Sequence, residues 1–272
     1  MNHLLAPIAI WLYGIMVLAA PPNRAQFEPA AMESIVQAEE RYRGISEAIA
    51  KVAFDPAEQP INGSRTFTAA LLLSIAFHES SFRRDVDLGI GRQRLAKSGW
   101  NDFGRSWCMM QINLGTKNVP DTRPGHKGNW REESNAQTED GWWGSELLAD
   151  REKCFRAGLH VIRRTWGCRG GTLSDALSKY AGGVCYVKAD EDKAKEDKDE
   201  TLLNKIRATR FASTNRVTRA LKWSKTKPKE WKDSEIVKAL ISPPAPPDAT
   251  SVGQNDTPLG AGPNASVVFL QQ

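Results

Sequence analysis

The sequence predicts a mainly α-helical fold, and two features of its pattern support this prediction. No segment shows the regular alternation of a convincing strand ladder. Five stretches carry apolar residues at the spacing of a helical face, and these are residues 28–55, 66–79, 146–166, 173–180 and 201–223. Between the second and third of them lies a polar region rich in Gly and Trp, and such long irregular regions inside a domain usually carry function. We therefore expect helices around an irregular loop region that could contain a small β element.

The first two helices are predicted from their apolar stripes. The stripe of residues 28–55 consists of Ile35, Tyr42, Ile45, Ile49 and Val52. Residues 56–65 are rich in turn-forming residues and indicate a loop. The next predicted helix, residues 66–79, is too apolar to be exposed, and we expect Thr66 or Thr68 to cap its start. Its buried face consists of Ala69, Leu72, Leu73 and Ala76, and Glu79 lies at its C-terminal end.

The later helices are predicted in the same way. The stripe of residues 146–166 consists of Leu148, Phe155, Leu159, Ile162 and Trp166. The helix of residues 173–180 ends at Gly182-Gly183, where glycine suits a helix stop, and its stripe consists of Leu173, Ala176, Leu177 and Tyr180. Residues 188–200 are almost wholly charged, which predicts a solvated helix or insertion. The last stripe consists of Leu203, Ile206, Phe211, Val217 and Leu221.

The composition is that of a soluble protein with a core, because 40% of the 272 residues are hydrophobic and 25% are charged. The net charge of +5 would attract an anionic surface. The sequence has no dense stripe of Arg and Lys interleaved with aromatic residues, so we expect no nucleic-acid partner. Residues 242–272 are dominated by Pro, Gly, Ala, Ser and Asn, and we predict a disordered tail there.

The N-terminal segment indicates export. Residues 4–20 carry no charge and are followed by Pro21-Pro22. Their length lies between that of a secretory hydrophobic region and that of a minimal membrane span. We predict that residues 1–25 are a signal peptide or an N-terminal anchor, and that the protein acts in the periplasm or cell envelope, where the segment could attach it to the inner membrane. A buried core helix is the alternative interpretation.

The four cysteines, Cys108, Cys154, Cys168 and Cys185, favour disulfides, because an even number in an exported chain is typical of disulfide pairing. Three pairings are possible, and the sequence does not choose between them. Reduced, buried thiols are the alternative. The spacing contains no CxxC pair, which argues against a zinc site.

The stretch AFHESSF, residues 76–82, places a glutamate where an apolar helix ends. A metalloprotease motif would need a second histidine one turn after His78-Glu79, but Phe82 stands there. Ser80 and Ser81 lack the G-x-S-x-G pattern of a nucleophile elbow. General acid catalysis remains as a role for Glu79. The helix C-terminus and partial burial both disfavour the carboxylate form and favour the protonated form. We therefore expect Glu79 to donate a proton, the alternative being a solvated helix end.

Three motifs occur in a recognisable order: Glu79-Ser80-Ser81-Phe82, then SWCMMQIN at residues 106–113, then ALSKYAGG at residues 176–183. Over residues 60–223 this order resembles the catalytic domain of soluble-type lytic transglycosylases, which are relatives of goose-type lysozyme. The resemblance implies a lysozyme-like domain over residues 59–225, preceded by a helical extension at residues 26–58, with the irregular loop region lining a glycan cleft.

The resemblance also implies roles for particular residues. Glu79 would be the catalytic acid, and the residues expected to line the cleft and contact the sugar are Ser106, Met110, Gln111, Asn113 and Tyr180. Cys108 stands where the family has glycine, and Ala181 stands where it has asparagine.

The family mechanism would make the protein a peptidoglycan lytic transglycosylase that needs no metal or cofactor. Glu79 would protonate the bond between N-acetylmuramic acid and N-acetylglucosamine, and the muramoyl C6 hydroxyl would then close a 1,6-anhydro ring. A lysozyme-like hydrolase is the first alternative, for which Asp85, Asp87 or Asp102 could supply a second carboxylate. The second alternative is a non-catalytic wall-binding component of an envelope machine.

Overall fold

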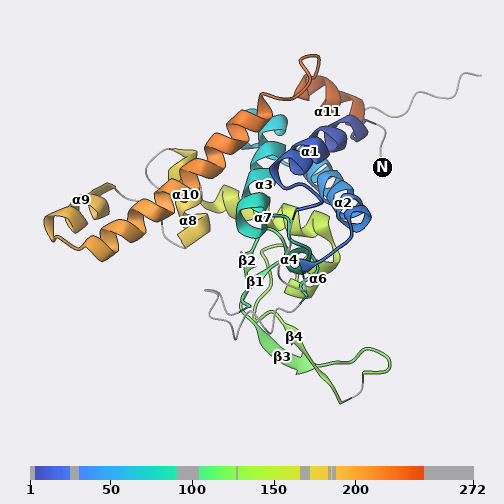
Figure 1. Ribbon diagram of the computed structural model, residues 1–272, viewed down its shortest axis with the longest axis horizontal. Coiled ribbons are helices and arrows are strands. Elements are labelled where there is room, and N and C mark those ends of the chain that lie inside the picture. Colours follow the sequence, from blue (N-terminus) through green and yellow to red (C-terminus); the bar gives the residue numbers. More distant parts are fainter. Residues whose placement is uncertain are drawn as a thin grey trace, which may run out of the picture. The chain divides into compact units, whose positions relative to one another are not determined.

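The computed structural model describes residues 4–24, 31–90, 104–126, 128–165, 172–182, 185 and 188–241, which belong to one compact unit. The prediction of a mainly α-helical fold is confirmed (Figure 1). The elements are α1 (Ala6–Ala19), α2 (Ile35–Phe54), the 3₁₀ helix η2 (Ile61–Gly63), α3 (Arg65–Ser80), α4 (Arg84–Asp87), β1 (Ser106–Trp107), β2 (Ile112–Asn113), β3 (Lys117–Pro120), β4 (Trp130–Glu133), α6 (Gly144–Ala149), α7 (Arg151–Thr165), α8 (Leu173–Gly182), α9 (Lys188–Glu196), α10 (Glu200–Ser224) and α11 (Asp233–Ile241).

Helix α3 is the centre of the core, where it packs against α2, α7 and α10 (Figure 1). Every residue from Arg65 to Ala76 is buried, which confirms that this stretch is too apolar for the surface. The predicted cap was wrong, because Ser64 caps the helix and accepts a hydrogen bond from the Phe67 amide at 3.1 Å. The Thr66 hydroxyl instead donates to Asp233, whose carboxylate also accepts from the Thr66 amide at 2.9 Å.

Helix α1 is formed by the apolar N-terminal segment and packs against α2. Its side chains Leu12 and Met16 are fully buried in the same hydrophobic core as α2 and α3. The Tyr42 hydroxyl donates to the carbonyl of Ala20 at 2.9 Å, which ties the end of this segment to α2. Among the described helices none is both long and apolar enough to cross a membrane. Export of the chain stays a prediction.

Three helices differ from the predicted pattern. On α2 the predicted apolar stripe is wrong at Ile35, which is 53% exposed. The helix predicted at residues 146–166 is divided at Asp150, whose extended backbone ends α6 and whose carboxylate accepts from the Glu152 amide at 2.8 Å to start α7. On α10, the predicted apolar stripe is wrong at Phe211 and Leu221, which are exposed. The buried face of α10 consists instead of Leu203, Ser213, Arg216 and Ala220. Small side chains there allow close packing against α3, and the Ser74 hydroxyl donates to the Arg216 carbonyl at 2.9 Å.

The irregular region contains two short antiparallel hairpins, β1–β2 and β3–β4. The expectation of a small β element is therefore confirmed. The charged insertion forms α9, and α11 was not predicted. Cys168, Trp166, Asp102 and the predicted tail at residues 242–272 lie outside the described residues.

A disulfide joins Cys108, in the turn of the β1–β2 hairpin, to Cys154 on α7. Cys185 is also disulfide-bonded. Cys108 has a φ of 55°, in the left-handed region that glycine adopts without strain. A residue with a side chain is strained in this conformation. The disulfide holds the strained turn against α7.

We expect loss of this disulfide to lower the free energy of unfolding by about 2–4 kcal/mol, since the bond closes a long loop. The double variant Cys108→Gly/Cys154→Ser should be about 1 kcal/mol more stable than Cys108→Ala/Cys154→Ser, because alanine is strained in a left-handed conformation. Urea unfolding of both variants measures the difference. Equal stabilities would show that the backbone at residue 108 does not favour glycine.

Candidate active site

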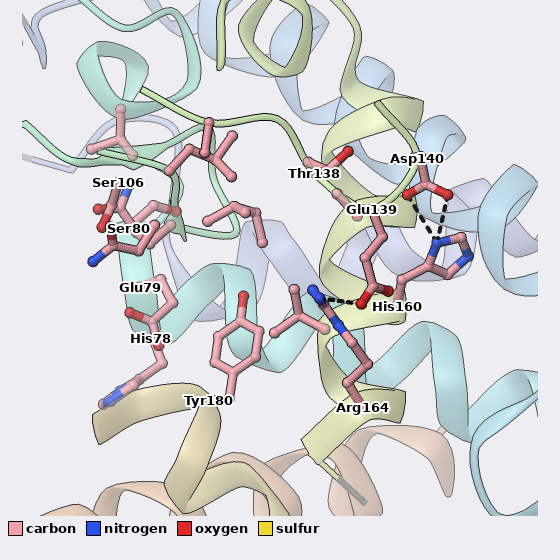
Figure 2. A pocket seen from close by; sticks show the side chains of 18 of the residues that line it. His78, Glu79, Ser80, Ser106, Thr138, Glu139, Asp140, His160, Arg164 and Tyr180 are labelled. Atoms are coloured by element: carbon pink, nitrogen blue, oxygen red, sulfur yellow. Dashed lines mark hydrogen bonds and ion pairs between the residues drawn. The ribbon is translucent and has the colours of Figure 1, made fainter. Parts of the chain in front are cut away.

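One cleft of about 1300 Å³ brings together most of the residues predicted for the site. Glu79, Ser106, Gln111, Asn113 and Tyr180 all line it. Met110 does not line the cleft and is fully buried. Figure 2 shows Glu79 and Ser106 on one side and a group of charged residues on the other, with Tyr180 between them.

The sequence Glu-Ser-Ser-Phe positions Glu79 by ending α3 abruptly. Ser81 adopts a left-handed backbone conformation, and its amide donates to the Phe77 carbonyl at 2.7 Å. The Ser80 hydroxyl accepts from the Phe82 amide at 3.1 Å. Phe82 then turns back into the core, with its ring 5.8 Å from that of Tyr42. Glu79, in the last turn of the helix, is therefore held at the boundary between core and cleft.

The β1–β2 hairpin supplies the polar residues beside Glu79. Ser106 and Asn113 are opposite each other in this hairpin. Gln111 has a φ of 50°, and its side-chain amide donates to the Cys108 carbonyl at 2.9 Å, which closes the turn. Trp107 lies on the other face, buried against Gly144, where a Cβ atom would be only 2.1 Å from the indole ring. The alternation along β1 thus places Ser106 in the cleft because Trp107 fills the core.

Met110 acts through its backbone. Its side chain packs against Gly158 of α7, where a Cβ atom would be 2.5 Å from the Met110 methyl group. Its carbonyl accepts a hydrogen bond from the Tyr180 hydroxyl. Burial, followed by the negative charge of Glu79, raises the pKa of Tyr180 well above its usual value of 10.0, although Arg216 partly opposes this. Tyr180 is therefore a neutral hydrogen-bond donor that links α8 to the hairpin.

Arg216 of α10 forms an ion pair with Glu79, and sequence reasoning did not find it. The side chain of Arg216 is 3% exposed and that of Glu79 20% exposed. The guanidinium of Arg216 supplies a counter-charge to the Glu79 carboxylate, which the core partly removes from water. Within the described structure, the buried Nε and Nη1 of Arg216 have no hydrogen-bond partner. No signal marks this arginine in the sequence, because it belongs to a helix with many exposed charges.

His78 adds no positive charge beside this pair. Burial, together with the nearby Arg216 and Arg219, lowers the pKa of His78 to about 4. The imidazole is therefore neutral near neutrality. Among the described residues no group of three His, Cys, Asp or Glu side chains could hold a metal ion.

Of the aspartates considered as a second carboxylate, Asp85 and Asp87 belong to the described residues. Asp85 lines it and is bound by Arg83, with the Arg83 Nε donating to Oδ1 at 2.9 Å. Asp87 is buried and does not line the cleft; it forms an ion pair with Arg151. Asp85 is therefore the one of these two that borders the cleft, with its side chain 4% exposed.

The opposite wall was not predicted as part of the site. It comprises Thr138, Glu139 and Asp140 from the loop before α6, and His160 and Arg164 from α7 (Figure 2). His160 lies far from His78 in the sequence. The fold brings α7 to the cleft, because its apolar face packs in the core and its polar face is left toward the loop.

No protein-family model matches the chain, and neither curated proteins nor solved structures show significant similarity to it.

Behind this wall, the buried Glu58 is expected to make stability depend on pH. Burial alone would raise its pKa, but hydrogen bonds from Arg163, Arg156 and His160 outweigh burial and lower it below the usual 4.5. A lowered folded-state pKa gives a stabilisation that is present above pH 4.5 and is lost as the pH falls through the folded-state value. Glu58→Gln should therefore be less stable at neutral pH and lose less stability on acidification. Urea unfolding at pH values from about 3 to about 7 tests this expectation.

Glu40→Gln, at an exposed position of α2, is the matched control for Glu58→Gln. It should reproduce the pH profile of the wild type. A parallel profile for Glu58→Gln would contradict the assignment of this pH dependence to Glu58.

The ion pair between Glu79 and Arg216 can be tested by a double-mutant cycle. Glu79→Gln leaves a buried guanidinium without its counter-charge, and we expect it to lower the free energy of unfolding by about 3 kcal/mol. Arg216→Met should cost less, since Glu79 is partly exposed to water. The double variant should lose at least about 1 kcal/mol less than the sum of the single losses. Additive losses in urea unfolding would show that the two side chains do not interact.

Proposed function

We propose that the protein is a peptidoglycan lytic transglycosylase with a lysozyme-like catalytic domain. The observation that carries this proposal is the convergence of Glu79, Ser106, Gln111, Asn113 and Tyr180 on one cleft. These residues come from three motifs separated by many positions in the chain. On the side of the cleft that holds Glu79, Ser106, Gln111, Asn113 and Tyr180 offer neutral hydrogen-bonding groups, which suit a neutral polysaccharide.

In the proposed reaction Glu79 enters as the acid. It donates its proton to the glycosidic oxygen between N-acetylmuramic acid and N-acetylglucosamine, and the bond from the muramoyl C1 to that oxygen breaks. The N-acetyl group of the muramoyl residue stabilises the positive charge that develops at C1. The resulting carboxylate of Glu79 accepts a proton from the muramoyl C6 hydroxyl, whose oxygen bonds to C1. The products are a 1,6-anhydromuramoyl end and a new N-acetylglucosamine end.

Arg216 and Tyr180 have supporting roles in this proposal. The Arg216 guanidinium stabilises the carboxylate that Glu79 becomes after it has donated its proton. Tyr180, which stays neutral, fixes the hairpin through the Met110 carbonyl and keeps its ring in the cleft. The reaction requires no metal or cofactor.

A lysozyme-like hydrolase is the second candidate, and the position of Asp85 favours it. Hydrolysis with two carboxylates requires a second carboxylate beside the scissile bond. Asp85 lines the cleft, but its bidentate contact with Arg83 would have to open before it could activate water. The resemblance to lytic transglycosylases assigns a catalytic role to Glu79 and none to Asp85. We therefore favour the transglycosylase.

We also propose that the protein acts outside the cytoplasm, in the periplasm or envelope. The disulfide between Cys108 and Cys154 supports this, since such bonds persist mainly in oxidising compartments. The uncharged residues 4–20 would serve as the export signal or anchor.

Digestion of purified sacculi tests the proposed function. Glu79→Gln should lower the rate of product release about 10²- to 10⁴-fold, the usual effect of removing a general acid. Mass spectrometry of the products identifies the reaction, because an anhydromuramoyl end is lighter than a hydrolysed end by one water. Glu235→Gln, an exposed residue outside the cleft, is the control and should retain full activity.

Three outcomes would change the proposal. Equal activity of Glu79→Gln and wild type would refute the role of Glu79. Products with only reducing ends would establish the hydrolase. Binding to sacculi without any product would favour the non-catalytic wall-binding component.

A further inference from the structure

One wall of the cleft is more highly charged than a neutral glycan requires. Glu139, Asp140, His160 and Arg164 all line the cleft and face Glu79 across it (Figure 2). The glycan backbone carries hydroxyl and acetamido groups, for which neutral partners such as Ser106, Gln111 and Asn113 are sufficient. The charged wall therefore suits a different part of a ligand.

Within this wall the His160–Asp140 pair is anchored. The His160 Nδ1 is 3.0 Å from both carboxylate oxygens of Asp140, and its Nε2 is 3.1 Å from Glu58. Glu58 is buried and is bound in turn by Arg156 and Arg163. Both nitrogens of His160 are thus engaged, so this pair forms the fixed base of the wall.

The second pair, Arg164 and Glu139, is joined within the described residues by an ion pair between two exposed side chains. The side chain of Arg164 is 49% exposed and that of Glu139 is 54% exposed. Ion pairs between exposed side chains contribute little to stability, so their charged groups can exchange one partner for another at small cost. The two side chains present one charge of each sign at the cleft.

We propose that this wall binds the peptide stem of peptidoglycan, with Arg164 bound to a stem carboxylate and Glu139 bound to a stem amine. This inference rests on the proposed function and names the part of the substrate that the wall selects. The stem is attached through the lactyl group to the same sugar ring whose C1 reacts, so it has to leave the cleft along one of its walls. A planar guanidinium binds a carboxylate through two parallel hydrogen bonds.

The signs of the charges favour a zwitterionic peptide over a polyanion. Wall polymers rich in phosphate would meet the carboxylates of Glu139 and Asp140, and like charges brought together in an interface are unfavourable. A peptide stem carries carboxylates and, where its diamino acid is not cross-linked, a free amine. Both signs on the wall then have a partner.

The experiment measures binding without cleavage. In the Glu79→Gln background, calorimetry compares a soluble peptidoglycan tetrasaccharide that carries stems with the same tetrasaccharide from which an amidase has removed them. The double variant Glu139→Gln/Arg164→Gln should bind the stem-bearing ligand about fivefold more weakly, the upper range for an exposed ion pair. Its affinity for the stem-free ligand should not change.

The matched control removes another ion pair of α7 that lies outside the cleft. Lys51 and Glu152 have side-chain exposures of 41% and 39%. Lys51→Gln/Glu152→Gln should leave both affinities unchanged. The free stem peptide, titrated into otherwise wild-type protein with and without the Glu139→Gln/Arg164→Gln change, repeats the comparison without the Glu79 substitution.

Equal effects of the double variant on both ligands, or none on either, would overturn the proposal. So would a protein that binds neither ligand. A wild type that leaves sacculi uncleaved would refute the proposed reaction, but a stem-dependent difference in binding would still support this wall as a peptide site.

Discussion

The candidate site depends on how the buried helix α3 ends. A helix surrounded by other elements must leave the core within a few residues and satisfy its last carbonyl groups. Here consecutive left-handed conformations at Ser81 and Phe82 turn the chain, and the Phe82 ring returns to the core against Tyr42. Glu79 belongs to the last turn before this bend. Its carboxylate is consequently held at the edge of the core, because Phe82 and Tyr42 beyond the bend are buried.

The same position explains the partner of Glu79. A carboxylate at the end of a buried helix is partly removed from water, which is unfavourable for a charged group unless it is paired. Arg216 supplies the counter-charge from α10, and α10 packs along α3. The ion pair therefore connects the packing of the two helices with the chemistry proposed for the cleft. Within the described residues, the buried Nε and Nη1 of Arg216 have no hydrogen-bond partner.

The opposite side of the cleft is built on α7. The disulfide from Cys154 holds the hairpin turn at Cys108, and Gly158 accommodates Met110. The next turns of the same helix present His160 and Arg164 to the cleft. One helix thus fixes the hairpin that carries Ser106 and Asn113, and also positions the charged wall that faces Glu79.

Much of the fold and part of the site could be predicted from the sequence, because local patterns carry the information. The spacing of apolar residues predicts α3, α7 and α8, and the motifs identify Glu79 and the cleft residues Ser106, Gln111, Asn113 and Tyr180. The tertiary structure alone decided which charged residues meet. Arg216 and Arg164 look like ordinary solvated residues in helices with many charges, and only the packing of α10 and α7 shows that one is buried against Glu79 and the other lines the cleft. Pairing of the cysteines was undecided for the same reason, since the distance between two side chains far apart in the chain depends on the fold and not on their spacing in sequence.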